Sequence, residues 1–177
     1  MLRGFVVGVL VTLVVALIGG YLVVTQGWMQ VSAQTKAGAF EKWAARASLK
    51  AAIVRGSMGL NDPLPLNDQN LSEGVRLYAA NCAVCHGAAD AKSSMLAEGL
   101  YIKAPLLAKD GVEDDPEPVT YWKIAHGIRF SAMPAFEGRL DDTQMWQLTQ
   151  FLKHMDSLSP SVDAQWKKVP SAARNSG

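Results

Sequence analysis

The longest apolar stretch of the chain runs from Phe5 to Val24, twenty residues without a charged side chain. A helix needs roughly 20 such residues to cross a hydrocarbon core of about 30 Å. Arg3 precedes the stretch, and the amphipathic rings of Tyr21 and Trp28 lie near its far end, as at a membrane interface. We therefore predict a transmembrane anchor at residues 1–28.

The same stretch has an alternative interpretation as a cleaved signal peptide. Val31 and Ala33 are small residues of the kind that a signal peptidase selects. The apolar run is longer than the roughly 7 to 15 residues usual in a signal peptide, which favours a retained anchor. Either interpretation exports the residues that follow.

A second helical pattern predicts a basic amphipathic linker helix within residues 29–60. Lys42, Arg46 and Lys50 form a basic row along it, and a neighbouring face is apolar. Such a helix can lie on anionic lipid, dock on a partner subunit, or pack on its own domain as a spacer, and the pattern does not separate these. The residues of the apolar face are Phe40, Trp43, Ala44, Ala47, Ala51 and Val54.

Turn-forming residues at 61–70 predict a domain boundary, after which helical patterns dominate. No alternating pattern is long enough to indicate a strand. We predict an all-α domain at residues 61–160 and a basic C-terminal tail at 161–177. Three helices are expected. The first begins at Asn70 or Ser72 and ends near Asn81, and the second begins at Asp115–Pro116 and ends at Gly127. The third begins with a capping box of Asp141 and Gln144.

Composition supports one domain with a membrane segment, because the 177 residues are 49% apolar and weigh 19.1 kDa. The net charge of +1 argues against a nucleic-acid-binding protein. Charge is nevertheless uneven: residues 35–56 hold five basic residues and one acid, whereas residues 61–160 hold eight basic and fourteen acidic residues. The acidic cluster Glu113–Glu117 fits a helix start or a partner-docking surface.

Both cysteines of the chain lie in the sequence NCAVCHG at residues 81–87. Cys82 and Cys85 would close too small a loop for a stabilising disulfide, and no βαβ pattern suggests a redox pair. A structural zinc site needs four ligands, which two cysteines and scattered histidines supply poorly. The CxxCH spacing fits covalent haem, with two thioethers and His86 as an iron ligand.

The second axial iron ligand is expected downstream, in a loop able to cover the opposite face of the haem. Met133 lies beside Pro134 in the sequence GIRFSAMPAF, outside any helical stripe. His126 and His154 are rival candidates. We predict Met133, because its proline neighbour restricts the backbone and the other methionines suit helix packing.

The sequences LYAANCAVCHG, YWKIAHGIRFSAMPAF and DDTQMWQLTQFLK together resemble class I c-type cytochromes, in particular small membrane-anchored monohaem cytochromes of bacteria. The resemblance covers roughly residues 71–155. It implies a compact helical fold in which the first and last helices cross. Gly74 and Tyr78 on the first helix should then lie against the last helix, which carries Trp146 and Phe151.

The resemblance also implies further site residues. The carbonyl of Pro105 should accept a hydrogen bond from the His86 ring nitrogen that does not bind iron, which orients the ring. Trp122, Ile128 and Arg129 occupy the segment that lies near the haem edge or propionates in such proteins.

These features predict a membrane-anchored carrier of single electrons with one haem c, rather than an enzyme with a small-molecule substrate. Axial ligation by His86 and Met133 leaves no open iron position, so the expected chemistry is outer-sphere electron transfer. The expected partners are a quinol-oxidising complex, a dehydrogenase or a terminal oxidase of a respiratory chain. Haem c attachment outside the cytoplasm predicts a single-pass inner-membrane protein with a cytoplasmic N-terminus and a periplasmic haem domain. The alternatives are a fixed subunit of an oxidase or dehydrogenase complex and a haem-based ligand sensor.

Overall fold

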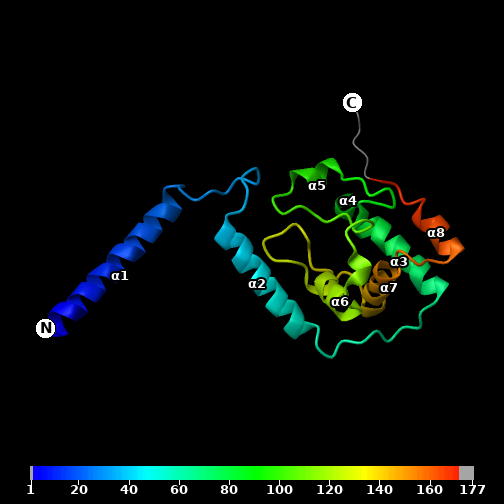
Figure 1. The fold of residues 1–177 in the computed structure, drawn as a ribbon, viewed down its shortest axis with the longest axis horizontal. Helices are drawn as coiled ribbons and strands as arrows, with labels where there is room; N and C mark the ends of the chain where they lie inside the picture. The colour runs from blue at the N-terminus through cyan, green and yellow to red at the C-terminus, as the bar shows by residue number, and fades with distance from the viewer. Residues whose placement is uncertain (1, 172–177) are drawn as a thin grey trace. The chain divides into compact units, whose positions relative to one another are not determined.

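The computed structural model describes residues 2–171, and the regular secondary structure in this part of the chain is helical apart from one isolated bridge between Glu137 and Leu140 (Figure 1). It divides into two compact units, Met1–Thr35 and Lys36–Gly177. An all-α fold is therefore confirmed. The helices are α1 (Leu2–Thr25), α2 (Ala39–Gly56), α3 (Asp68–Asn81), α4 (Ala83–His86), α5 (Met95–Gly99), a 3-10 turn (Val112–Asp114), α6 (Glu117–His126), α7 (Asp142–Lys153) and α8 (Pro160–Trp166).

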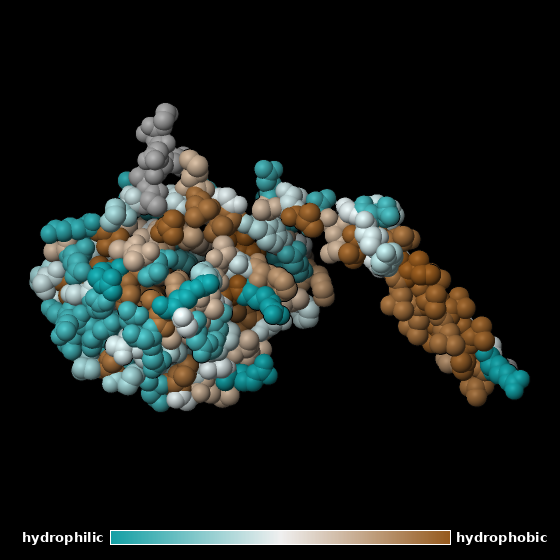
Figure 2. All heavy atoms as spheres, turned by 180° about the vertical axis from the view of Figure 1, so that it is seen from behind, coloured by the Kyte–Doolittle hydropathy of each residue, from teal (hydrophilic) through white to brown (hydrophobic). Residues whose placement is uncertain are grey.

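The first unit contains α1, a continuous apolar helix of 24 residues. At 1.5 Å per residue its length is about 36 Å, which exceeds the hydrocarbon thickness of a bilayer. All its described side chains are exposed, and Figure 2 shows the helix as a mostly hydrophobic rod. Among the described residues it is the one helix long and apolar enough to cross a membrane, by length and composition alone.

Helix α3 begins earlier than the sequence pattern predicts. The side chain of Asn67 accepts a hydrogen bond from the backbone N–H of Asn70 at 2.9 Å, so Asn67 is the N-cap. The predicted caps, Asn70 and Ser72, lie inside the helix. The error arose because Asn67, Asn70 and Ser72 are all chemically suitable caps, and only the backbone conformation distinguishes them.

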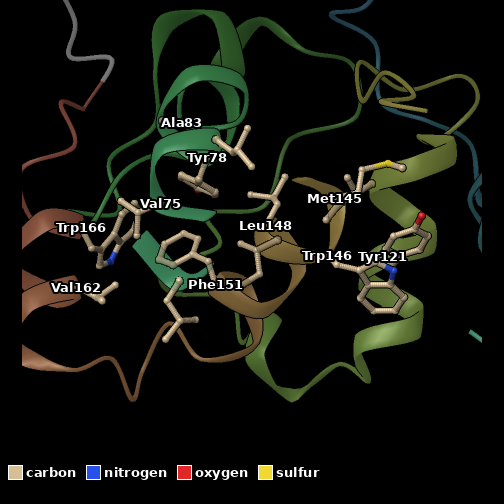
Figure 3. Close-up of a cluster of buried hydrophobic side chains, with 14 of the residues drawn as sticks. Val75, Tyr78, Ala83, Tyr121, Met145, Trp146, Leu148, Phe151, Val162 and Trp166 are labelled. Carbon is tan, nitrogen blue, oxygen red and sulfur yellow. The ribbon is translucent and has the colours of Figure 1, made fainter. Parts of the chain in front are cut away.

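Helices α3 and α7 cross in close contact, as the resemblance implied. A Cβ atom at Gly74 would lie 2.3 Å from the carbonyl oxygen of Gln147 and 2.6 Å from Cβ of Phe151, so only glycine permits this approach. One turn further on, the rings of Tyr78 and Phe151 meet edge to face with centroids 5.5 Å apart. The crossing forms the centre of the core (Figure 3).

The structure corrects the first part of the predicted C-terminal tail, because residues 160–166 form α8 and pack against α3. Val162 is fully buried and Trp166 is 4% exposed. The Trp166 ring lies edge to face against both Tyr78 and Phe151, with centroids 5.2 and 5.1 Å apart (Figure 3). The domain therefore extends beyond residue 160, while the last predicted tail residues, 172–177, lie outside the described part of the chain.

The predicted boundary at residue 61 also differs from the structure, because α2 packs on α6 within the second unit. Ile53 is buried there, and Gly56 lies so close to Trp122 that a Cβ atom would be 2.0 Å from its Nε1. The predicted apolar face of α2 is not the packed one: Phe40 and Trp43 are 76% and 65% exposed. Helix α2 carries two apolar faces, and the sequence alone did not reveal which one meets the domain.

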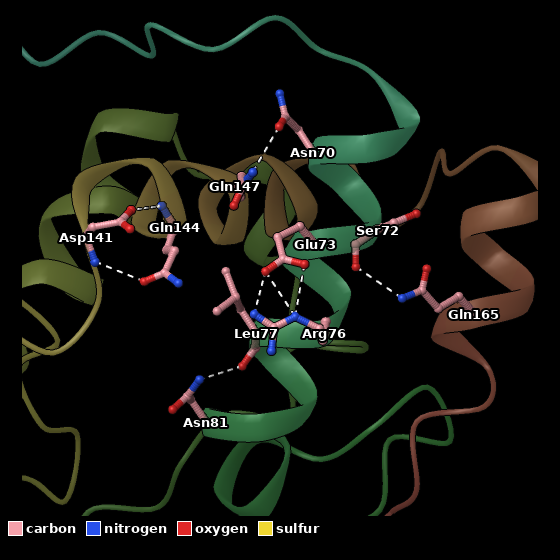
Figure 4. A network of polar contacts seen from close by, with 10 residues as sticks. All are labelled: Asn70, Ser72, Glu73, Arg76, Leu77, Asn81, Asp141, Gln144, Gln147 and Gln165. Atoms are coloured by element: carbon pink, nitrogen blue, oxygen red, sulfur yellow. Dashed lines mark hydrogen bonds and ion pairs between the residues drawn. The ribbon is translucent and has the colours of Figure 1, made fainter.

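The helix ends of α6 and α7 follow their sequence signals. Pro116 precedes α6 and Gly127 ends it at a φ of +63°. Asp141 and Gln144 form the predicted capping box of α7 (Figure 4). The same view shows side-chain hydrogen bonds that connect α3 with its two neighbours: Gln147 with Asn70, and Gln165 with the backbone of Ser72.

Candidate haem site

A cavity of about 470 Å³ lies inside the second unit, between the end of α3, α4, α6, α7 and the loops that join them. Its volume falls in the range of about 300 to 1,000 Å³ that is usual for ligand and cofactor sites. Most of the lining surface is apolar, which suits a large apolar ring system, and four charged residues, Lys103, Asp110, Asp115 and Lys123, also line the cavity. The aliphatic lining includes Leu100, Ile102, Leu107, Ile124, Leu148 and Leu152.

Cys82, Cys85 and His86 all line this cavity. Cys82 ends α3, and α4 follows at once, with the backbone N–H groups of Cys85 and His86 both donating to the Cys82 carbonyl at 3.0 and 2.9 Å. Gly87 then ends α4 at a φ of +76°, and its carbonyl accepts a hydrogen bond from the buried Tyr78 hydroxyl at 2.8 Å. The CxxCH turn is thus held directly by the core residue at the helix crossing.

The cysteine environment disfavours thiolate chemistry. Burial raises the pKa of the Cys82 thiol to about 12, and the neighbouring Cys85 sulfur adds to the rise. A redox-active cysteine reacts as its thiolate, which a raised pKa suppresses at neutral pH. Within residues 2–171, moreover, no group of three or more His, Cys, Asp or Glu side chains is placed to hold a metal ion. A zinc site and a reactive redox pair therefore both fit poorly.

The His86 ring is oriented by the backbone carbonyl of Pro105. Nδ1 of His86 lies 2.9 Å from that oxygen, and because a carbonyl only accepts, Nδ1 carries the proton. Burial lowers the pKa of His86, and the hydrogen bond to Pro105 partly offsets the lowering. A neutral ring with a protonated Nδ1 leaves Nε2 as the nitrogen able to bind a metal.

Met133 lines the same cavity from the loop between α6 and α7. Its carbonyl accepts from the N–H of Ile128 at 3.1 Å, and its own N–H donates to the Ser131 hydroxyl at 3.2 Å. Gly127 makes the loop possible, because a Cβ atom there would lie 2.6 to 2.7 Å from backbone atoms of Met133, Pro134 and Ala135. The sequence indicated Gly127 as a helix end and a loop residue, but it gave no sign of the close approach to residues 133–135 or of the Ser131 hydrogen bond.

The rival ligands lie elsewhere. Neither His126 nor His154 is among the cavity-lining residues. His126 is exposed, with Nδ1 3.3 Å from a carboxylate oxygen of Glu137, and His154 follows the end of α7. Met133 is therefore the candidate that shares the cavity with His86.

Three further residues were expected near the haem, and the structure places one of them at the cavity. Ile128 lines it, as does Pro105. Trp122 and Arg129 do not: Trp122 packs against Gly56 of α2 and edge to face with His126, and Arg129 is exposed, 5.9 Å from the Phe130 ring centroid. The resemblance located the segment, but neighbouring side chains of a helix and loop point in different directions.

One lining residue, Leu49, comes from α2 and was not anticipated. It lies on the helix face opposite the apolar face that the sequence predicted. The spacing of Leu49, Ile53 and Gly56, at four and three residues, is the signal that could have identified the packed face.

Comparison with known proteins finds cytochromes similar to the helical domain. Residues 69–152 match the family model described as cytochrome C oxidase, cbb3-type, subunit III. Cytochrome c6 of Parathermosynechococcus lividus is 28% identical over 86 residues, which cover 47% of this chain and 87% of that protein. Cytochrome c6 of Synechococcus elongatus is 28% identical over 83 residues, with the same shares of the two chains. No solved structure matches the chain.

The helical domain with its CxxCH turn is a class I c-type cytochrome. Members of this family bind haem c and are electron carriers rather than enzymes. The aliphatic cavity beside the two cysteines and the histidine fits such a group.

Proposed function

We propose that this chain is a membrane-anchored monohaem cytochrome that passes single electrons between membrane-associated redox proteins. The observation that carries the proposal is the shared cavity, which brings Cys82, Cys85, His86 and Met133 together from two distant parts of the sequence. In this assignment Cys82 and Cys85 would hold the haem covalently, and His86 and Met133 would bind its iron. The bound haem supplies a reversible one-electron couple.

The protein residues then tune and protect that couple. The Pro105 carbonyl fixes the His86 tautomer and strengthens its nitrogen as a donor. The aliphatic lining excludes water and disfavours the more highly charged oxidised state, which raises the reduction potential. The backbone contacts at Ile128 and Ser131 hold Met133 in its loop. With its iron held by His86 and Met133, the haem would exchange electrons with partner proteins without binding a substrate.

The ligand assignment is tested by substituting Met133. In Met133→Ala the thioethers keep the haem attached, while the ferric spectrum loses methionine ligation, the potential falls and carbon monoxide binds the reduced protein. The matched control is Met95→Ala, because Met95 is exposed on α5 and outside the cavity lining. An unchanged spectrum and potential in Met133→Ala would overturn the assignment. Carbon monoxide binding by the wild-type reduced protein would favour a ligand sensor instead.

We infer that α1 is a retained single-pass anchor, with its N-terminus in the cytoplasm and the haem domain in the periplasm of a bacterial inner membrane. Its length and uninterrupted apolar sequence support this inference. Mass spectrometry of the protein extracted from membranes provides the test, because a retained anchor preserves the N-terminal sequence. A mature N-terminus near residue 34 in a soluble fraction would show a signal peptide.

A fixed subunit of an enzyme complex is the second candidate, supported by the matched family description, which names an oxidase subunit. The two candidates predict different behaviour during purification in mild detergent. A carrier for a quinol-oxidising complex, a dehydrogenase or a terminal oxidase separates from its partners, whereas a subunit co-elutes with stoichiometric companions. Co-elution that survives high salt would favour the subunit.

A further inference from the structure

Helix α2 has two apolar faces that point in opposite directions. The first contacts the cytochrome domain: Leu49 lines the cavity, Ile53 is buried, and Gly56 lies against Trp122. The hydroxyl of Tyr101, in the loop after α5, also donates to Glu41 at 2.6 Å. These contacts make α2 part of the domain, so the orientation of α2 determines the orientation of the haem cavity.

The second face has no covering among the described residues of the second unit. Phe40, Trp43 and Val54 on it are 76%, 65% and 57% exposed. At 100° per residue they lie within about 60° of one another, or about 80° with Ala47 and Ala51 included, and about 150° from the packed face. Exposed aromatic residues gathered in this way mark an interaction surface.

Positive charge lies on one flank of α2, beside this exposed face. Lys42, Arg46 and Lys50 follow one another at four-residue spacing and are all exposed. The acid of α2, Glu41, lies on the other side of the helix, where it accepts the Tyr101 hydrogen bond. An apolar face with Trp and Phe and a flanking basic row is the pattern of a helix that lies in the interface of an anionic membrane.

We propose that α2 lies along an anionic lipid surface, with Phe40, Trp43 and Val54 in the headgroup and acyl boundary and the basic row on phosphate groups. This rests on the proposed retention of α1 as an anchor. The chain between α1 and α2 is residues 26–38, which span at most about 45 Å when fully extended. Anchored chains therefore always hold α2 close to a bilayer, which favours lipid over a protein partner as the occupant.

The arrangement has a consequence for electron transfer. Because Leu49 and the exposed aromatics lie on opposite sides of α2, lipid contact places the helix between the bilayer and the cavity. The cytochrome domain is then held in one orientation rather than tumbling freely on the segment 26–38.

The test compares two single-cysteine variants of the full-length holoprotein in lipid nanodiscs. Ala47→Cys is on the exposed apolar face, and Ala45→Cys is an exposed position on the opposite side of the same helix. Cys82 and Cys85 are consumed as thioethers, so a nitroxide label attaches to the new thiol. Paramagnetic relaxation then reports whether the label meets oxygen, which concentrates in lipid, or a water-soluble nickel chelate.

In nanodiscs that contain phosphatidylglycerol, the ratio of oxygen to nickel accessibility is expected to rise several-fold at Ala47→Cys and to stay at the aqueous value at Ala45→Cys. The substitutions Lys42→Gln, Arg46→Gln and Lys50→Gln together should lower the Ala47→Cys ratio toward its value in phosphatidylcholine nanodiscs, since the basic row supplies the preference for anionic lipid. A wild-type haem spectrum in each variant confirms folding.

Two results would overturn the proposal. Equal aqueous ratios at both labels would show that α2 stays in water, and protection of Ala47→Cys from both reagents would show that protein, such as a second copy, covers this face. Neither result would affect the electron-transfer assignment. Failure of the anchor itself would be distinguishable, because the chain would not remain with the nanodisc.

Discussion

Gly127 lies against the backbone of the loop that carries Met133, the proposed iron ligand. The substitution Gly127→Ala should therefore displace Met133. The residue has φ +63° and ψ −169°, a region that is nearly exclusive to glycine and costs other residues about 1–3 kcal/mol. A new Cβ would also lie 2.6 to 2.7 Å from three backbone atoms of residues 133–135. Overpacking of this kind adds about 1–3 kcal/mol, so we expect a loss of about 4 kcal/mol or a shifted loop.

The chain offers a matched control in Gly138, which also has a positive φ of +78° but where a Cβ atom would have no heavy atom within 4 Å. Gly138→Ala therefore carries the backbone cost alone, about 1–2 kcal/mol. Guanidinium unfolding of both holoproteins, followed by circular dichroism, measures the difference, and the ferric spectrum reports methionine ligation. Equal midpoints and unchanged spectra in both variants would refute the argument that the close approach at Gly127 positions the ligand.

Three further predictions concern the core, a helix cap and the covalent attachment. Trp166→Ala should destabilise the holoprotein by about 3–5 kcal/mol, because it removes a buried ring. The control Lys168→Ala, at an exposed position, should change the free energy of unfolding by less than about 0.5 kcal/mol. A small effect of both substitutions would show that the residues after 160 do not stabilise the domain. Asp141→Ala removes the α7 N-cap and should cost about 1 kcal/mol in the same unfolding assay, and no loss would mean that the capping box does not stabilise the domain. Cys85→Ala should abolish or weaken covalent haem attachment, seen as loss of haem from the denatured protein; haem retained at the wild-type level would contradict the thioether assignment.

The sequence predicted the elements whose signals are local. The capping box at Asp141, the glycine that ends α6, and the CxxCH turn each depend on a few neighbouring residues, and the structure has them where expected. The crossing of α3 and α7 is a long-range contact, and only the family resemblance implied it. Its physical cause, the close approach at Gly74, is visible only once both helices are placed.

Each difference from expectation has a physical reason in the structure. Helix α2 has enough apolar residues for two faces, and the close approach of Gly56 to Trp122 lies on the face that packs. Helix α8 has only two buried residues, Val162 and Trp166. Two residues are too short an apolar pattern to indicate a helix, so the nearby basic residues led to the prediction of a tail. Trp122 and Arg129 lie outside the cavity lining for a related reason, since sequence position defines a segment but not the direction of each side chain.

The structure separates the groups that hold the fold from the groups proposed to hold the iron. Tyr78, Phe151 and Trp166 form a closed aromatic cluster at the α3–α7–α8 junction, while Met133 lies on a loop held mainly by backbone hydrogen bonds. Substituting Met133 itself should therefore change the potential far more than the stability. The histidine side is different, because the Tyr78 hydroxyl binds the Gly87 carbonyl and so couples the core directly to the CxxCH turn. Substitutions in the core should therefore disturb the position of His86 more than the position of Met133.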